Sequence, residues 1–302
     1  MARCLITGHK GYIGTRLYEK LKSLGHEVMG IDMKPDLAGR PGPDINTLRG
    51  LVEDHEGNFH PHWYNFKPEY VFHLACIPRV AYSVEEPVKT TYNNVMIGTN
   101  TLNFARKVGA KRVIYSSSSS IKGNGNGPVS PYGLQKMVTE EECRIYSELY
   151  GLDTISLRYF NVYSPCQKAF GTYTTAVANF MEHVRSNKNP FITGNGEQER
   201  DMANLEDVVD ANIWAMEQDK DFGGKHYDVG TGTNITLNEI KNIVHDYFPN
   251  VKFDYVEERK GDVFSTCANM SPLKELGWSP KIKIQEGISE CFKKLKESLD
   301  AK

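Results

Sequence analysis

The chain has 302 residues, 39% of them hydrophobic and 25% charged, and its 36 basic and 38 acidic side chains give a net charge of −2. This balance is ordinary for a soluble globular protein and gives no electrostatic reason to expect binding to nucleic acid or to a membrane. No apolar run approaches the roughly 18 residues of a membrane span, and a strand pattern at the very start leaves no room for a signal peptide. The six cysteines are scattered without a C-x-x-C pair, which indicates reduced packing residues, a cytoplasmic protein and no metal site.

The amino-terminal segment predicts a strand, a glycine-rich loop and a helix, in that order. An apolar strand over residues 3–7 runs into a loop with Gly8, Gly11 and Gly14, and leucines at helical spacing follow. This is the context that a dinucleotide-binding fingerprint requires. Gly8 permits the tight turn, Gly11 lets the backbone approach a pyrophosphate, and Gly14 lets the helix pack close to the strand.

A second strand ends at Asp32, which lies 24 residues past Gly8. A carboxylate at this position can bind the ribose hydroxyls of an adenosine, and it would repel a 2′-phosphate, so the sequence favours NAD over NADP. The alternative is a turn residue before Pro35. Residues 33–70 are the least readable part, with Asp44-Ile45 as the candidate end of a third strand. Histidines at 55, 60 and 62 lack the spacing of a metal site and are interpreted as solvated loop residues.

Further strands are predicted at 71–75, 111–116 and 154–162, with helices over 94–108 and from residue 130 onwards. Strands and helices that alternate at this spacing predict a parallel, doubly wound α/β sheet of the Rossmann type. Ligands of such sheets lie at the carboxyl ends of the strands, so Gly8, Asp32, Ala75 and Ser118 should gather along one edge.

The alternation becomes irregular after residue 165. Helices are predicted near 176–184, 207–216, 237–247 and 288–299, and strands near 226–229 and 251–256. This pattern favours a smaller α/β substrate lobe interleaved with the last part of the sheet. We therefore expect an NAD-binding domain at 1–163 and 198–230 and a substrate-binding lobe at 164–197 and 231–302.

The candidate chemistry lies where the strand at 111–116 runs into five serines and a glycine-rich loop. A helix then begins with Ser130 as N-cap and Pro131 at its first position, and it carries Tyr132 and Lys136 on one face. A phenol has a pKa of about 10, and a nearby ammonium group would lower it, so Tyr132 could act as a general base near neutral pH. A serine hydroxyl from the strand end could bond the same reacting oxygen. Alone, such a pair is more often a surface contact.

Other short motifs strengthen the case, and together they are specific. They are Thr7-Gly8-x-x-Gly11-x-x-Gly14, His73-Leu74-Ala75, Ser83-Val84-Glu85-x-Pro87, Asn94-x-x-x-Gly98-Thr99, Tyr132-x-x-x-Lys136, Arg158-Tyr159-Phe160-Asn161-Val162-Tyr163, Gly196-x-Gln198-x-Arg200-Asp201, Val229-Gly230, Arg259-x-Gly261-Asp262 and Leu276-Gly277-Trp278. With these residues the chain resembles, over nearly its whole length, an extended short-chain dehydrogenase/reductase of the nucleotide-sugar epimerase and dehydratase group.

The resemblance implies NAD as cofactor, a nucleotide sugar as substrate, and Tyr132 as base with Lys136 as its electrostatic partner and Ser118 as its hydroxyl partner. The implied cofactor-binding residues are Gly8, Lys10, Gly11, Tyr12, Ile13, Gly14, Asp32, Asp44, Ile45, Leu74, Ala75 and Asn94, together with Tyr132 and Lys136. The implied substrate-binding residues are Ser118, Asn161, Arg200, Arg259 and Thr266, of which Asn161 and the two arginines would bind the diphosphate.

One position departs from the family pattern. The family's serine or threonine lies four residues before a tyrosine that is followed by glycine, and here Lys122 stands in the place of that tyrosine before Gly123. The departure leaves open whether Ser118 or Ser117 points inward.

The resemblance also bears on the reaction. Family dehydratases carry an Asp-Glu pair, and epimerase-reductases a cysteine, where this chain has Ser119 and Ser120, so both reactions are disfavoured. Our hypothesis is a UDP-hexose 4-epimerase: Tyr132 removes the proton of the 4-hydroxyl, a hydride passes to NAD, and it returns to the other face of the 4-keto sugar. The resemblance also implies that Thr266 occupies the position at which family members limit bulk at the sugar C2, and threonine is small enough to admit an N-acetyl group.

Two groups of alternatives remain open. One is a nucleotide-sugar decarboxylase, dehydratase or reductase of the same family, and the other is a non-catalytic NAD-binding sensor or scaffold. The resemblance further implies a homodimer formed through the helices at 94–108 and 132–150.

Overall fold

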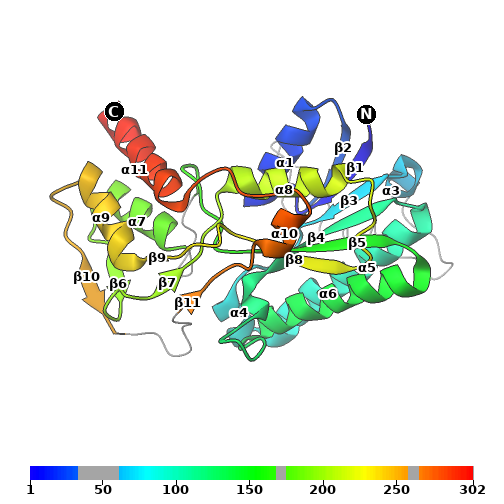
Figure 1. Ribbon diagram of the computed structural model, residues 1–302, viewed down its shortest axis with the longest axis horizontal. Helices are drawn as coiled ribbons and strands as arrows, with labels where there is room; N and C mark the ends of the chain where they lie inside the picture. The colour runs from blue at the N-terminus through cyan, green and yellow to red at the C-terminus, as the bar shows by residue number, and fades with distance from the viewer. Residues whose placement is uncertain (33–60, 168–174, 258–264, 302) are drawn as a thin grey trace. The chain divides into compact units, whose positions relative to one another are not determined.

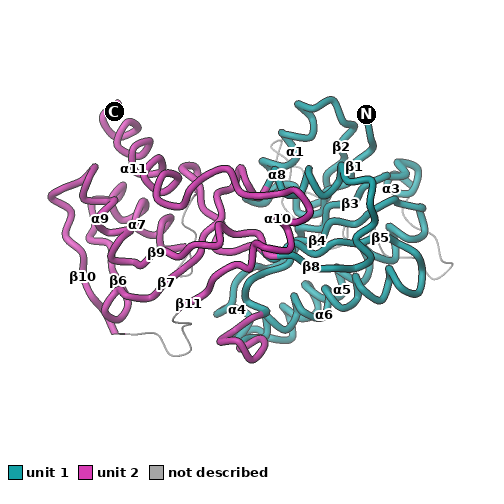
Figure 2. Tube along the Cα trace, in the orientation of Figure 1, with its two compact units in different colours: residues 1–121, 130–158, 209–227 teal, residues 122–129, 159–208, 228–302 magenta. Residues whose placement is uncertain are grey.

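The computed structural model describes residues 1–32, 61–167, 175–257 and 265–301. These residues form two compact units, each built from several stretches of the chain (Figure 2). The first unit comprises residues 1–121, 130–158 and 209–227, and the second comprises 122–129, 159–208 and 228–302. The sequence predicted domain limits at residues 163, 197 and 230, whereas the compact units change after residues 121, 129, 158, 208 and 227. As a division into cofactor and substrate lobes, that expectation stays a prediction.

A six-stranded sheet forms the centre of the doubly wound fold. Its strands are β1 (Arg3–Thr7), β2 (Glu27–Ile31), β3 (Tyr70–His73), β4 (Arg112–Ser118), β5 (Asp153–Tyr159) and β8 (Lys225–Val229), in the order β2-β1-β3-β4-β5-β8. The β1–β2, β1–β3 and β3–β4 pairs run parallel. Every residue of β4 is buried, as expected for a central parallel strand covered on both faces. The predicted Rossmann-type fold class is confirmed.

Helices cover both faces of this sheet (Figure 1). Figure 1 shows α5 (Pro87–Val108) and α6 (Pro131–Tyr150) on one face, and α1 (Tyr12–Ser23) and α8 (Leu205–Glu217) on the other. The shorter helices are α3 (Pro61–Phe66), α4 (Val80–Glu85) and the 3₁₀ turn η2 (Ser119–Ile121). Helix α5 begins at Pro87, seven residues before the predicted start. Proline suits the first position of a helix, because the N–H that it lacks would have no intrahelical partner there.

The second unit has its own core. Helices α7 (Ala176–Arg185), α9 (Leu237–Tyr247) and α11 (Ile284–Asp300) bury apolar side chains against one another, Phe180, Val244 and Phe292 among them. Short strands β6 (Phe191–Thr193) and β10 (Asp254–Val256) form one pair, and β11 (Ser265–Thr266), β7 (Glu199–Arg200) and β9 (Ile235–Thr236) form a small sheet. Helix α10 (Ser271–Glu275) completes the unit. The predicted strand at 251–256 is confirmed only over β10.

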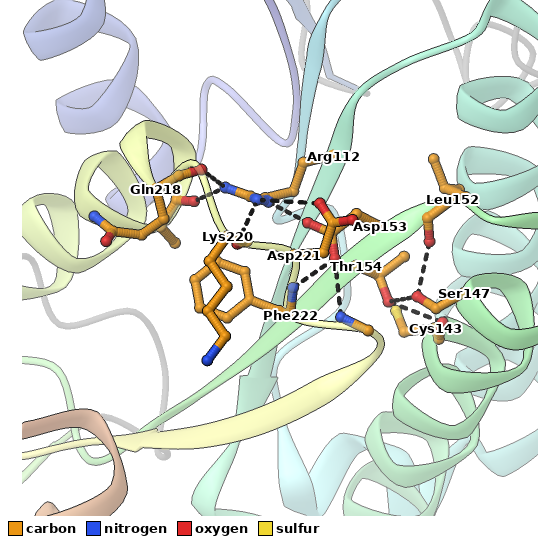
Figure 3. A network of polar contacts seen from close by, with 12 residues as sticks. Arg112, Cys143, Ser147, Leu152, Asp153, Thr154, Gln218, Lys220, Asp221 and Phe222 are labelled. Atoms are coloured by element: carbon orange, nitrogen blue, oxygen red, sulfur yellow. Dashed lines mark hydrogen bonds and ion pairs between the residues drawn. The ribbon is translucent and has the colours of Figure 1, made fainter. Parts of the chain in front are cut away.

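A buried arginine fastens the turn between α8 and β8 to the start of the central strands (Figure 3). Arg112, at the first position of β4, forms an ion pair with Asp153, at the first position of β5. Its guanidinium group also donates to the carbonyl oxygens of Ala215 (2.6 Å), Gln218 (2.8 Å) and Lys220 (2.9 Å). These carbonyls belong to the last turn of α8 and the residues after it, where intrahelical donors are missing, so Arg112 satisfies that helix end.

Two features are absent from the residues that the structure describes. None of the helices there is long and apolar enough to cross a membrane. No group of three or more His, Cys, Asp or Glu side chains in those residues could hold a metal ion. Of the three clustered histidines, His62 is exposed on α3, and the other two lie outside the described residues.

Candidate functional site

The glycine-rich loop joins β1 to α1 and packs closely on itself and on the residues after β3. Gly8 has a φ of +79°, and a Cβ added there would lie 2.8 Å from the backbone nitrogen of Ala75. A Cβ on Gly14 would lie only 2.1 Å from the carbonyl oxygen of Gly8. Gly11 is the N-cap of α1 and makes no side-chain cap, so the amides at the start of the helix, Tyr12 and Ile13, can face an anion. These features fit the predicted pyrophosphate site.

The carboxylate of Asp32 closes the other side of this loop. The residue is buried directly after β2, and its Oδ2 accepts a hydrogen bond of 2.8 Å from the backbone nitrogen of Lys10. This places an acidic group beside the loop at the carboxyl edge of the sheet, as a ribose-binding role requires. Asp44 and Ile45, the other candidates for the adenosine, lie outside the described residues.

The end of β3 is held against β1 through a threonine. The backbone nitrogens of Leu74 and Ala75 donate to the carbonyl oxygen (3.1 Å) and the hydroxyl oxygen (3.3 Å) of Thr7. The same hydroxyl shares a hydrogen bond of 2.7 Å with Nδ1 of His73. Burial, with a smaller effect of the Lys136 charge, lowers the pKa of His73 to about 3. The imidazole therefore stays neutral.

Two serines cap the helix that carries the predicted base. Ser130 is the N-cap of α6, and its hydroxyl accepts from the backbone nitrogen of Gly133 at 3.1 Å. The backbone nitrogen of Tyr132 donates instead to the hydroxyl of Ser83, a buried residue of α4, at 3.0 Å. Since Pro131 has no N–H, these bonds satisfy the first donors of the helix and fix the position of Tyr132.

Tyr132 and Lys136 are both buried, on the same helix and one turn apart. The Nζ atom of Lys136 donates to the carbonyl oxygen of Ser116 at 2.6 Å, and it lies 4.9 Å from the ring centroid of Tyr115 and 6.0 Å from that of Tyr132. Burial raises the pKa of Tyr132 well above its usual value, the thiol of Cys76 raises it further, and a hydrogen bond with Ser118 lowers it. The net shift is upward because desolvation of the phenolate dominates, and the expectation that Lys136 favours the phenolate stays a prediction.

The structure separates the two candidate serines. Ser117 donates to Oε2 of Glu140 at 2.7 Å, and the same buried carboxylate pairs with Arg158. Ser118, at the end of β4, shares a hydrogen bond with the side chain of Tyr132 and donates to Oγ of Ser120 at 3.1 Å. The geometry therefore favours Ser118 as the hydroxyl partner of the tyrosine.

The amide of Asn94, predicted to line the cofactor path, is engaged by neighbouring helices. Its Oδ1 accepts from the backbone nitrogen of Ile77 at 2.7 Å, and its Nδ2 donates to Oε1 of Gln135 at 2.7 Å. Gln135 donates in turn to the hydroxyls of Thr90 and Thr91, each at 3.0 Å. Nothing in the sequence pattern singles out Gln135 except its place beside Lys136, yet its bonds hold α6 against α5.

The predicted substrate-binding residues other than Ser118 belong to the second unit. Asn161, with a φ of +35°, donates from Nδ2 to the carbonyl oxygen of Asp201 at 2.8 Å. Arg200 lies on β7 and donates to the carbonyl oxygen of Glu199 at 2.8 Å. Thr266 lies on β11, and its buried Oγ1 makes no hydrogen bond within the described part of the chain. Arg259 lies outside the described residues.

A buried carboxylate organises this part of the second unit. Oδ1 of Asp201 accepts from the backbone nitrogen of Thr231 (2.8 Å), and Oδ2 accepts from those of Gly232 (2.8 Å) and Ala268 (3.0 Å). The backbone nitrogen of Asp201 donates to the carbonyl oxygen of Thr266 at 2.9 Å. Asp201 thus connects the end of β8 to the strands that carry Arg200 and Thr266.

Comparisons with known proteins agree with this geometry. The model of the NAD-dependent epimerase/dehydratase family matches residues 4–230. A putative UDP-glucose 4-epimerase of Methanocaldococcus jannaschii is 30% identical over 97% of this chain and 98% of its own. A UDP-N-acetylglucosamine 4-epimerase structure from Methanobrevibacter ruminantium has a TM-score of 0.85 at 27% identity, covering 98% of this chain and 99% of that one. A UDP-glucose 4-epimerase structure from Thermotoga maritima has a TM-score of 0.84 at 30% identity, with the same coverage. The chain therefore belongs to the NAD-dependent epimerase/dehydratase family, and it is an enzyme whose cofactor is NAD.

Proposed function

We propose that the protein interconverts the C4 epimers of a UDP-hexose or a UDP-N-acetylhexosamine through a 4-keto intermediate. The observation that carries the proposal is the hydrogen bond between the side chains of Tyr132 and Ser118, next to the buried ammonium group of Lys136. The similarity to UDP-sugar 4-epimerases over nearly the whole chain supports the same reaction.

Each residue of this group has a separate role in the proposed reaction. Tyr132 takes the proton of the sugar 4-hydroxyl and returns it after the sugar has turned over, while Ser118 donates a hydrogen bond to the same oxygen. Lys136 lies one helical turn away and holds a positive charge below the tyrosine ring. NAD supplies the hydride acceptor and donor, and its cationic nicotinamide ring would favour the phenolate that burial alone disfavours.

The residues after Ser118 argue against dehydration. Loss of water needs an acid and a base beside the serine, and this chain has Ser119 and Ser120 there, in the turn η2. In this structure the single hydrogen of Ser118 is donated to Oγ of Ser120, so the hydroxyl has to rotate toward the sugar oxygen when substrate binds. Epimerisation needs no group beyond Tyr132, Ser118 and Lys136.

The substrate-side residues suggest how the nucleotide sugar would be bound. Asn161, Arg200 and Arg259 are proposed to bind the diphosphate, for which the planar fork of an arginine is well suited. The cofactor would be held by the glycine-rich loop, by Asp32 and by the backbone after β3. The unpartnered hydroxyl of Thr266 could accept the N–H of an acetamido group, which adds to the steric reason for expecting N-acetylated sugars.

A panel of nucleotide sugars tests the proposal. The purified enzyme is incubated with UDP-, GDP-, CDP- and dTDP-sugars, and the products are separated and identified by NMR and mass. We expect one UDP-sugar to give a product of unchanged mass that differs only at C4, with no net reduction of NAD. A product lighter by carbon dioxide or water would establish the decarboxylase or dehydratase alternative, and no turnover of any sugar would favour a sensor or scaffold.

A substitution of Thr266 tests the sugar preference. Thr266→Tyr should abolish activity on UDP-N-acetylglucosamine and retain activity on UDP-glucose, because the larger side chain would fill the space of the acetamido group. Full retention of the N-acetyl activity would show that Thr266 does not select the sugar.

The predicted homodimer and cytoplasmic location stay predictions. Exposed apolar side chains on α5 and α6, such as Tyr92, Met96 and Leu149, support association through these helices. The mass of the protein in solution, measured by light scattering, tests the dimer.

A further inference from the structure

The segment that joins β4 to α6 is held by the second compact unit. Residues 122–129 belong to that unit, although β4 and α6 both belong to the first (Figure 2). Ser118 lies four residues before this segment, and Tyr132 lies three residues after it. Since four extended residues span at most about 14 Å, whatever fixes residue 122 also limits where Ser118 can lie.

An ion pair anchors the first residue of the segment. The Nζ atom of Lys122 pairs with Oδ2 of Asp228 and lies 5.1 Å from the ring centroid of Phe160. The side chain of Asp228 is only 5% exposed and that of Lys122 is 32% exposed. The same oxygen of Asp228 accepts from the backbone nitrogen of Asn269 at 2.8 Å. A pair that is shielded and hydrogen-bonded in this way is stronger than an exposed one.

The segment itself is compact. The backbone nitrogen of Gly125 donates to the carbonyl oxygen of Lys122 at 2.9 Å. Gly123 has a φ of +50°, and a Cβ there would lie 2.1 Å from the carbonyl oxygen of Gly127. The ion pair therefore fastens a closed loop, and a displacement of Lys122 would move the loop as a whole.

Asp228 is also close to the network around Asp201. It lies near the end of β8, two residues before Gly230, where an added Cβ would lie 2.7 Å from Oδ2 of Asp201. Asn269, which bonds Asp228, follows Ala268, which bonds Asp201. Lys122 is thus connected through two carboxylates to the strands that carry the proposed substrate-binding residues.

We propose that the Lys122–Asp228 ion pair is a positioning device that aligns the segment between Ser118 and Tyr132 with the substrate-binding part of the second unit. The inference rests on the proposed epimerase function. Lys122 does not touch the reacting atoms in this account; it acts through the segment. Misplacement of reacting groups by about 1 Å costs on the order of a hundredfold in rate, so loss of the pair should be visible in the kinetics.

The test compares three variants with the wild-type holoenzyme on the UDP-sugar that it epimerises. Lys122→Met should lower kcat/KM by about ten- to a hundredfold and leave the dissociation constant of NAD unchanged. Lys122→Arg should restore most of the activity because it keeps the charge. Lys252→Met, which removes an exposed lysine of the same unit, is the matched control and should behave as wild type.

Hydrogen exchange of residues 122–129 provides a readout that does not depend on catalysis. We expect faster exchange in Lys122→Met than in wild type, and saturating UDP should protect the segment in wild type but not in the variant. Wild-type kinetics or wild-type exchange in Lys122→Met would overturn the inference. If that variant does not fold, Asp228→Asn, which still accepts from Asn269, takes its place with the same expectations. A wild-type enzyme that epimerises no sugar would refute the proposed function, and the exchange experiment would still decide the role of the pair.

Discussion

The buried arginine at the start of β4 allows a sharp test of how the first unit is stabilised. Arg112 and Asp153 are 5% and 7% exposed, and the guanidinium group is also stacked 4.7 Å from the ring centroid of Phe222. Arg112→Met keeps most of the aliphatic volume and removes the charge and all the hydrogen bonds. It leaves the carboxylate of Asp153 with only the backbone nitrogens of Phe222 (2.7 Å) and Gly223 (2.9 Å) as donors.

Removing one partner of a buried ion pair typically costs about 3–5 kcal/mol, because the other charge stays buried without compensation. Three carbonyl oxygens at the end of α8 also lose their donor, which places Arg112→Met toward the upper part of that range. With a urea dependence of about 3 kcal/mol per molar, the midpoint of unfolding should fall by about 1–2 M. Asp153→Asn in the Arg112→Met background should recover part of the loss, since the remaining buried group is then neutral.

Urea unfolding followed by tryptophan fluorescence measures this effect. Trp214 is a suitable probe, because its ring lies 5.8 Å from that of Phe222 beside the network. Arg144→Met is the control, since Arg144 forms only exposed pairs with Glu141 and Glu148 on α6, and it should barely move the midpoint. An Arg112→Met midpoint equal to that of wild type would refute the assignment of this network as a main stabiliser of the unit.

Three further predictions concern the site itself. His73 has a pKa of about 3 in the folded protein against about 6.5 when unfolded, so the unfolded state binds more protons below pH 6.5 and stability is lost as the pH falls. Between about pH 7.5 and pH 5 the loss from this group should be about 2 kcal/mol, and His73→Gln should flatten the pH dependence of the free energy of unfolding, measured with urea, by that amount. Gly14→Ala should weaken NAD binding, measured by calorimetry, by at least about tenfold, since its Cβ would meet the carbonyl oxygen of Gly8 at 2.1 Å. An unchanged affinity would contradict the assignment of the glycine-rich loop as the pyrophosphate site. Ser118→Ala should lower kcat by about ten- to a hundredfold, whereas Ser117→Ala should affect mainly stability. If steady-state kinetics show the larger loss of kcat in Ser117→Ala, then Ser117 and not Ser118 is the hydroxyl partner of Tyr132.

Local patterns predicted much of the first unit. The strand at 3–7, the glycine-rich loop and the helix with Ser130 as its cap were readable because turn, cap and apolar spacing act over a few residues. The same holds for the helix over 237–247, whose capping box of Thr236 and Glu239 agrees with its apolar period. Helix α4 was missed because it has only six residues and one buried side chain, Ser83, so it shows no apolar period.

Contacts between residues far apart in the sequence could not be predicted from local patterns. Arg112 and Asp153 each begin a strand, and nothing in either strand indicates that they meet or that the carbonyls after α8 join them. The role of Ser117 depended on Glu140 of α6, and the pKa of Tyr132 depended on its burial. A spacing of four residues places two side chains on one helix face, but it does not say how much solvent each of them loses.

The central claim is that Tyr132 is the proton acceptor of a sugar hydroxyl, and Tyr132→Phe tests it most directly. The substitution removes one oxygen from a helix position that is fixed through its backbone by Ser83. Turnover of the nucleotide sugar that the wild-type enzyme epimerises should fall at least about a hundredfold, with the affinity for NAD retained, as expected for loss of a general base. Turnover close to that of wild type would contradict the account.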